Sequence, residues 1–138
     1  MIVDPKDLIE EFVGVPYLKD GRTSEGVDCY GVMVLAYRKR GLEIPDVKTD
    51  ATTLLMHRHF GIPIRYPCEI GPWDAVLMSW SEDRDNDLGL VTHVALAIDR
   101  TNILHAVSKA GGVVLDRLTY YEPYIVAIGR MRLPKINA

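Results

Sequence analysis

The sequence predicts an α+β domain in which N-terminal helices pack on a curled antiparallel sheet of about five or six strands. Helical patterns of apolar residues precede Pro72, and short β-rich runs separated by turn residues follow it. No linker or internal repeat divides the chain. We therefore expect a single domain over residues 1–138.

The composition is that of an ordinary globular protein. Of the 138 residues, 48% are hydrophobic and 25% are charged. The net charge of -3 offers no broad basic face for a nucleic-acid backbone. The N-terminus lacks a basic leader before an apolar segment, and no apolar run reaches the roughly 20 residues of a membrane span. We expect synthesis in the cytoplasm without a signal peptide, no nucleic-acid partner and no membrane span.

Asp4 and Pro5 mark the start of the first predicted helix. Aspartate accepts hydrogen bonds from exposed amides, and proline suits the first helical position. This helix is expected to run to about Val13 and to stop at Gly14, which can adopt the left-handed conformation. Residues 15–27 are polar and contain Gly and Pro, so they are expected to form a surface loop.

Asp28 is predicted to cap a second helix, which ends at Gly41. The inward face of this helix carries Val32, Met33, Ala36 and Tyr37. A third, weaker helical pattern covers residues 49–61. After Pro72, strands are expected within residues 74–80, 91–98, 102–107, 111–118 and 124–133.

Cys29 is the candidate nucleophile. It follows Asp28 in the first turn of the second helix, where exposed amides and the helix dipole favour a thiolate and can hold an oxyanion. The alternative is that Cys29 is a small buried hydrophobic residue. Cys68 has no identifiable partner and is assigned a structural role. With two cysteines and no signal peptide, we expect both to be thiols.

His93 is the candidate base, and His105 is the residue expected to orient it. His93 shares its strand face with Ala95 and Ala97, whose small side chains are expected to leave room for a helix end. A hairpin centred on Arg100 places His105 opposite Ala95, on the face of His93. A two-residue turn would put the rings on opposite faces. The catalytic arrangement therefore requires an odd loop or a bulge.

Other uses of the histidines stay open. Both His93 and His105 could be ordinary sheet residues. A cysteine with two histidines can also bind zinc, but the chain lacks a close ligand pair such as C-x-x-C, so no metal or cofactor is expected. His57 and His59 lie two residues apart on the third helical pattern, point in different directions and are expected at the surface.

Four segments in order resemble the NlpC/P60 family of papain-like cysteine peptidases. The segment "GVPYLKDGRTSEGVDCYGVMVLAYRKRGLEIP" is similar to the family's G-x-P-Y, D-C-S-G-L-V and G-x-x-L-P motifs. "GPWDAVLM" is similar to its P-G-D-L-V strand, "THVALAI" to H-V-G-I-Y and "NILHA" to M-I-H-A. The resemblance covers most of the chain and implies the NlpC/P60 fold.

The resemblance implies a Cys29, His93 and His105 triad that hydrolyses peptidoglycan stem peptides without metal or cofactor. The bond cleaved in this family commonly joins γ-D-glutamyl to a diamino acid. Tyr17 matches the family tyrosine that borders the site.

Tyr17, Asp28 and Tyr30 are the candidate substrate contacts. Asp28 could be only a helix cap, and Tyr17 could serve packing alone. Tyr30 stands where most members have a serine, which puts the cleaved bond in question. Trp73 and Ala95 replace family glycines.

The aromatic residue after Cys29 and the ending from "GVVLDRL" to "IVAIGRMRL" look more like the tail-assembly branch of bacteriophages and prophages. That resemblance implies tail-tip proteins as partners and a place in a virion tail. Two alternatives stay open. One is a tail structural or assembly module with a weakly active or inactive peptidase fold. The other is an amidase of the related CHAP type or a deamidase.

Overall fold

The computed structural model describes residues 1–46, 60–80 and 91–132 and confirms the α+β architecture. The helical elements in these ranges are η1 (Pro5–Leu8), α1 (Ile9–Phe12), α2 (Cys29–Lys39), η3 (Ser108–Ala110) and η4 (Leu118–Tyr124), where η marks a 3₁₀ helix. The strands are β1 (Arg22–Thr23), β2 (Gly26–Val27), β3 (Ile62–Pro63), β4 (Ala75–Met78), β5 (His93–Ala97), β6 (Asn102–Val107), β7 (Gly112–Arg117) and β8 (Ile125–Arg130).

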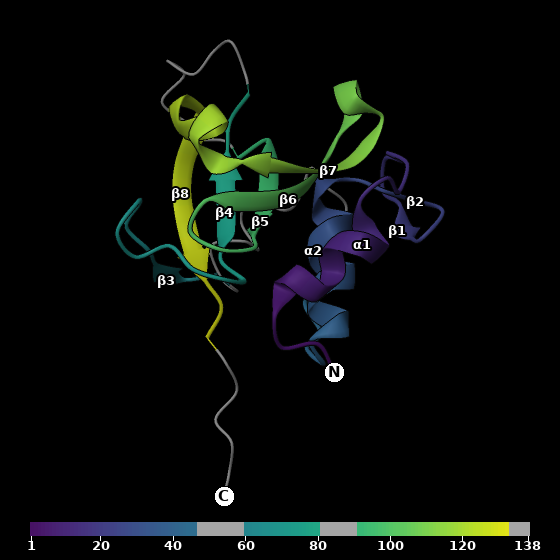
Figure 1. Cartoon of the computed structure of the whole chain (residues 1–138), viewed down its shortest axis with the longest axis horizontal. Helices are drawn as coiled ribbons and strands as arrows, with labels where there is room; N and C mark the ends of the chain where they lie inside the picture. Colours follow the sequence, from purple (N-terminus) through teal and green to yellow (C-terminus); the bar gives the residue numbers. More distant parts are fainter. Residues whose placement is uncertain (47–59, 81–90, 133–138) are drawn as a thin grey trace, which may run out of the picture.

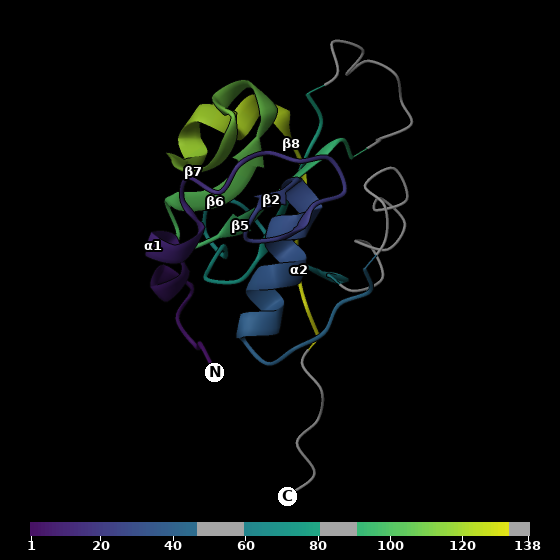
Figure 2. The ribbon, with the colours of Figure 1, turned by 90° about the vertical axis from the view of Figure 1, so that its right-hand side faces the viewer.

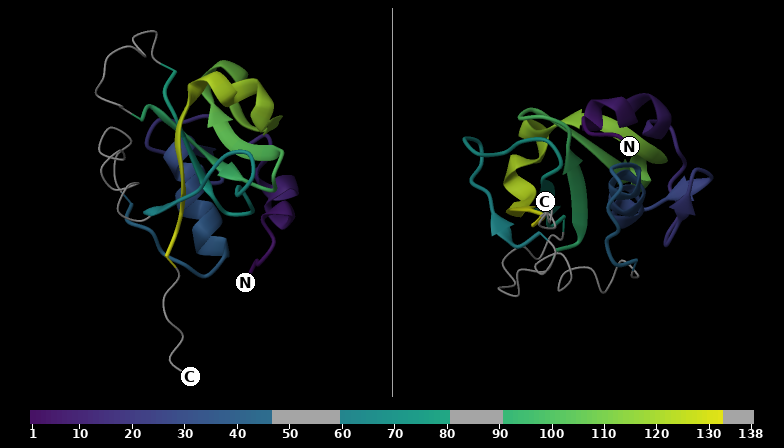
Figure 3. Two further views of the ribbon diagram at one scale, coloured as in Figure 1. Left: turned by 90° about the vertical axis from the view of Figure 1, so that its left-hand side faces the viewer. Right: turned by 90° about the horizontal axis from the view of Figure 1, so that it is seen from below.

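In the described part of the chain, six strands form one sheet in the order β3-β8-β4-β5-β6-β7, and neighbouring strands are antiparallel. β1 and β2 form a separate antiparallel pair. Figure 1 shows α1 and α2 together on one side of the sheet, while η4 lies near the ends of β4 and β8 (Figure 1, Figure 3). α2 packs mostly on β5 of this sheet, and it also contacts β6 and β1 (Figure 2).

Several element predictions need correction. The first helix begins at its Asp4 cap, which accepts from the Lys6 amide at 3.0 Å, but it is a 3₁₀ turn followed by a single turn of α-helix. Tightened first turns of this kind are common at helix ends. The predicted surface loop contains the β1–β2 pair, and β3 and η4 were not predicted. Most of the third helical pattern, with His57 and His59, lies outside the described residues.

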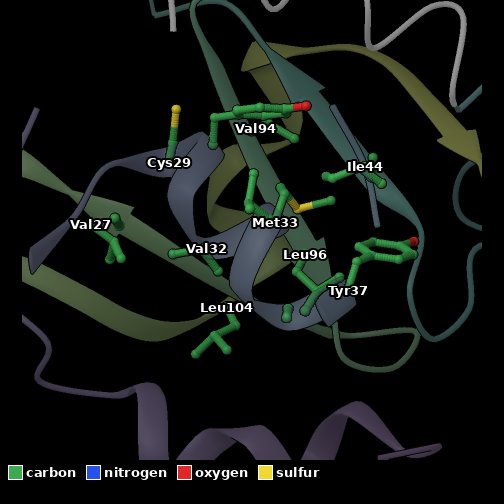
Figure 4. Packing of buried hydrophobic residues seen from close by; sticks show 14 of the residues in the cluster. Val27, Cys29, Val32, Met33, Tyr37, Ile44, Val94, Leu96 and Leu104 are labelled. Atoms are coloured by element: carbon green, nitrogen blue, oxygen red, sulfur yellow. The ribbon is translucent and has the colours of Figure 1, made fainter. Parts of the chain in front are cut away.

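Alternate residues of β5 face two different layers. Val94 and Leu96 pack in the cluster that contains α2, as Figure 4 shows, whereas Ala95 and Ala97 belong to a second cluster with Leu118 of η4. The expectation that α2 packs on the alanine face is therefore wrong. The larger side chains supply more apolar surface for the helix, and the face that carries the small residues is covered by η4 instead.

A buried carboxylate fixes the start of α2. Asp28 is fully buried, and its Oδ1 accepts from the Gly31 amide at 2.8 Å, as an N-cap does. The same oxygen pairs with an Arg22 guanidinium nitrogen at 2.8 Å, and Oδ2 accepts from the Asp20 amide at 2.9 Å. The predicted cap is confirmed. It also ties the helix start to the loop before β1.

Gly31 permits this close approach. A Cβ at this position would lie 2.3 Å from the carbonyl oxygen of Gly21, a backbone atom that cannot move aside. A side chain here would therefore push α2 away from the segment that carries Asp20 and Arg22.

Trp73 adopts a backbone conformation that glycine favours, with φ of 74°. Its indole N–H donates to the Val3 carbonyl at 2.7 Å, and its ring contacts Tyr37 at 5.4 Å and Arg40 at 4.8 Å. These contacts offset the backbone strain and join the N-terminus to the end of α2. They explain how a tryptophan is accommodated at a position where the motif that this segment resembles has glycine.

We predict that Asp28→Ala lowers the free energy of unfolding by about 3 kcal/mol or more, because it removes the cap and leaves buried donors unpaired. The matched control is Asp4→Ala, which removes an exposed N-cap and should cost about 1 kcal/mol. Urea denaturation of both variants and wild type measures the two losses. Equal losses would contradict the role assigned to Asp28.

Candidate active site

Cys29 is the first residue of α2, and its side chain is 6% exposed. Figure 4 shows the sulfur at one end of the core cluster, pointing away from Leu96 and Leu104. The backbone amides of Val94 and Tyr30 lie near the sulfur and lower the pKa of its thiol. Because Val94 follows His93 in β5, these contacts place the sulfur at the N-terminal end of that strand.

The β5–β6 hairpin has the odd loop that the catalytic arrangement requires. The Ile98 amide donates to the Asn102 carbonyl at 2.9 Å, which leaves residues 99–101 as the loop. Asp99 holds this loop by accepting from the amides of Thr101 at 2.9 Å and Asn102 at 2.8 Å. Leu96 pairs with Leu104, so His105 continues the register opposite Ala95, on the face of His93.

The two histidines are directly hydrogen-bonded. Nε2 of His93 lies 2.8 Å from Nδ1 of His105, and both side chains are buried. This contact uses one ring nitrogen of His93. Nδ1 of His93 is therefore the nitrogen that remains to act as a base.

Cys29 and His93 line one cleft of about 720 Å³. Its walls come from the loop before β1, from the start of α2 and from the strands and turns around the histidines. Aromatic residues are prominent among the lining residues, which are Tyr17, Cys29, Trp80, Thr92, His93, Ala106, Val107, Ser108, Lys109, Tyr120, Tyr121 and Tyr124. The cleft thus has an aromatic wall and the basic side chain of Lys109.

Trp80 covers the histidine pair. Its ring centroid lies 4.3 Å from that of His93 in an edge contact, and it stacks parallel to His105 at 6.4 Å. The ring of Tyr121 contacts both His105, at 5.0 Å, and Trp80, at 5.5 Å. The aromatic rings exclude water from the imidazoles, and this disfavours their charged forms.

Burial decides the resting protonation of the site. It raises the pKa of the Cys29 thiol to about 11, although the Val94 and Tyr30 amides act in the opposite direction. Burial, together with the neighbouring His105, holds the pKa of His93 well below 6.5. Burial thus opposes the thiolate that the helix end was predicted to favour. The directions of these two pKa shifts favour a neutral thiol and a neutral imidazole at neutral pH.

Asp116 extends the chain of contacts and was missed from the sequence. Its Oδ2 lies 2.9 Å from Nε2 of His105 and accepts from the Tyr121 hydroxyl at 2.7 Å. Val114 pairs with His105 across β6 and β7, and Asp116 lies two residues later, on the same face. That register could have been found from the sequence only by pairing "NILHAV" with "GGVVLDRL".

Tyr17 lies on the cleft wall with Cys29, as the sequence predicted for a residue that borders the site. Its amide donates to the Gly111 carbonyl at 2.9 Å. The next residue, Gly112, allows this approach, since a Cβ there would lie 2.3 Å from the Val15 carbonyl oxygen. Contact between Tyr17 and substrate stays a prediction.

Asp28 and Tyr30 do not line the cleft, so the structure does not support them as substrate contacts. The Asp28 carboxylate is fully buried in its cap. Tyr30 is 1% exposed, its hydroxyl donates to the Pro45 carbonyl, and Arg22 lies over its ring. Both side chains fix the start of α2 instead.

Within residues 1–46, 60–80 and 91–132, no group of three His, Cys, Asp or Glu side chains is arranged to hold a metal ion. Cys29 and Cys68 are both free thiols, the first buried and the second exposed. None of the helices described is long and apolar enough to cross a membrane.

Solved structures with the same fold include an NlpC/P60 family protein from Bacillus cereus ATCC 10987, which is 22% identical with a TM-score of 0.74 and is matched over 93% of this chain and 39% of its own. NlpC2 from Trichomonas vaginalis is 21% identical with a TM-score of 0.75, over 92% of this chain and 45% of its own. The peptidoglycan hydrolase RipB from Mycobacterium tuberculosis is 19% identical with a TM-score of 0.59, and the match covers 94% of this chain and 68% of RipB.

The chain thus spans less than half the length of the first two of these proteins. No curated protein matched it. The model of the NlpC/P60 family matches residues 14–130, which include every residue of the site described above. On this match, the chain belongs to the NlpC/P60 family.

Proposed function

We propose that this protein is a cysteine peptidase that hydrolyses peptidoglycan stem peptides through a single domain spanning residues 1–138. Cys29 is the nucleophile, His93 the general base and His105 the residue that orients His93. The observation that carries the proposal is that Cys29, at a helix start, lines the same cleft as His93, whose ring is hydrogen-bonded to His105. Membership of the NlpC/P60 family and the fold shared with RipB support it.

The first half of the reaction forms a thioester. The Cys29 thiol gives its proton to Nδ1 of His93 as the sulfur attacks the carbonyl carbon of the scissile amide. The N-terminal end of α2 stabilises the oxyanion of the tetrahedral intermediate. The C–N bond then breaks, and the leaving amine takes the proton from His93.

The second half regenerates the enzyme. His93 accepts a proton from water as the water oxygen attacks the thioester carbon. The tetrahedral intermediate collapses with cleavage of the C–S bond, and the sulfur recovers its proton from His93. The products are a carboxylic acid and the free thiol of Cys29.

The finer proposal is that the scissile bond joins γ-D-glutamyl to a diamino acid, and that the enzyme works in the tail of a phage or prophage. An aromatic wall and the exposed Lys109 in the cleft support a peptide substrate that carries carboxylates. The aromatic Tyr30 after the nucleophile motivates the tail assignment.

A tail structural module with little activity is the second candidate. The observation that favours it is the low exposure of Cys29 together with the high pKa of its thiol. Such a module would keep the fold and lack turnover. The experiments below separate the two candidates.

We predict that the wild type cleaves a muropeptide containing a γ-D-glutamyl-diaminopimelate bond, and that Cys29→Ala lowers kcat by about a thousandfold or more. Cys68→Ala is the matched control and should keep full activity, because Cys68 is exposed and outside the cleft. Chromatography of the products measures turnover and identifies the bond. Equal turnover by Cys29→Ala and wild type would remove the mechanism. A folded wild type without turnover would favour the structural module.

We predict that the acid limb of kcat/KM lies below pH 6.5, because the pKa of His93 is held well below that value. His93 thus stays neutral, and competent as a base, until the pH falls further. Trp80→Ala exposes the His93 ring and should move the limb upward, towards the ordinary histidine pKa. The rate profile of both proteins between about pH 4 and pH 8 provides the measurement. A wild-type limb at or above pH 6.5 would contradict the burial of the base.

A further inference from the structure

We propose that Asp116 is a positioning residue that fixes the ring protons of both histidines, so that His93 presents a lone pair at Nδ1 to Cys29. Tyr121 holds the Asp116 carboxylate in place for this role. The proposal deepens the proposed function, on which it rests for the assignment of His93 as base. Neither residue belongs to the triad predicted from the sequence.

The proton arrangement follows from the order of donors and acceptors. The Tyr121 hydroxyl and Nε2 of His105 both lie within hydrogen-bond distance of Asp116 Oδ2, and an ionised carboxylate can only accept. Nε2 of His105 must therefore carry a proton. A neutral His105 then has a lone pair on Nδ1, which can only accept from Nε2–H of His93. His93 is left with its own lone pair on Nδ1.

The opposite arrangement would disable the base. If His105 carried its proton on Nδ1, the lone pair of its Nε2 would face the carboxylate at 2.9 Å. The same proton would point at Nε2 of His93, which would then have to carry its own proton on Nδ1. His93 could not accept a proton from Cys29 in that state. The choice between these arrangements is made at Asp116, two side chains away from the sulfur.

The charges of Tyr121, Asp116 and His105 are consistent with this role. The pKa of Tyr121 is raised by burial and by Asp116, so its hydroxyl keeps its proton and remains a donor. The Asp116 carboxylate opposes the effect of burial on the pKa of His105. When His93 takes the thiol proton, its Nε2–H still donates to His105. No proton has to move between His93, His105 and Asp116, and only the hydrogen bonds between these residues strengthen.

Histidine tautomers can be read from long-range ¹H–¹⁵N spectra, which need no substrate. We expect wild type at neutral pH to show neutral His93 and His105, each protonated on Nε2. We expect Asp116→Ala to lose this single arrangement in both rings. A wild-type His93 protonated on Nδ1 would overturn the proposal, as would an unchanged spectrum in Asp116→Ala.

Kinetics on the γ-D-glutamyl-diaminopimelate muropeptide supply the second readout. Asp116→Ala should lower kcat by at least about tenfold with little change in KM, because the substrate still binds while the base is misdirected. Arg117→Ala is the matched control on the opposite, exposed face of β7 and should match wild type. Thermal denaturation checks that each variant is folded.

Wild-type kcat in a folded Asp116→Ala would overturn the proposal. If Asp116→Ala does not fold, the wild-type spectrum still decides the proton arrangement. If wild type fails to cleave the muropeptide, the proposed function fails, while the spectra test the role of Asp116 independently.

Discussion

The buried carboxylate of Asp28 is the constraint on which the site depends. It binds the first turn of α2, the Asp20 amide and the Arg22 guanidinium together, so the helix can begin at only one place. Cys29 is the next residue, and its sulfur is thereby delivered to the amide of Val94. An isolated helix end of this length would fray. Here the cap, and the packing of α2 on β5 and β6, hold the nucleophile in one position.

The site forms where the two layers on either side of the sheet meet. α2 lies on the face of Val94 and Leu96, whereas the alternation of β5 directs His93 to the face covered by η4. The N-terminal end of β5 is thus reached from both sides. This arrangement surrounds the base with aromatic rings and places the sulfur against backbone amides. Because burial favours the neutral form of both groups, we expect transfer of the proton to accompany attack on the substrate.

Much of this could be predicted from the sequence, because it depends on local rules. The Asp28 cap and the inward face of α2 follow from short-range patterns. The odd β5–β6 loop was a requirement of the catalytic arrangement that the sequence left open, and the structure has this loop. The alternation of side chains along a strand defines its two faces, but it does not show which helix covers each face. The packing of α2 and η4 on opposite faces of β5 could therefore not be predicted. Asp116 was missed for a similar reason, since its position depends on the pairing of β6 with β7. Tyr30 was misjudged because adjacency to Cys29 in sequence does not bring its side chain into the cleft.

The central claim is that Cys29 and His93 form a neutral thiol and imidazole pair, and the rate at which Cys29 reacts with iodoacetamide tests it most directly. The measurement is made on a Cys68→Ser background so that only one thiol reacts. With a thiol pKa of about 11, the rate constant should keep rising with pH through the neutral range and beyond pH 9, in proportion to the thiolate fraction. A rate constant that is already high and constant between about pH 5 and pH 8 would reveal a preformed thiolate–imidazolium pair and contradict the account.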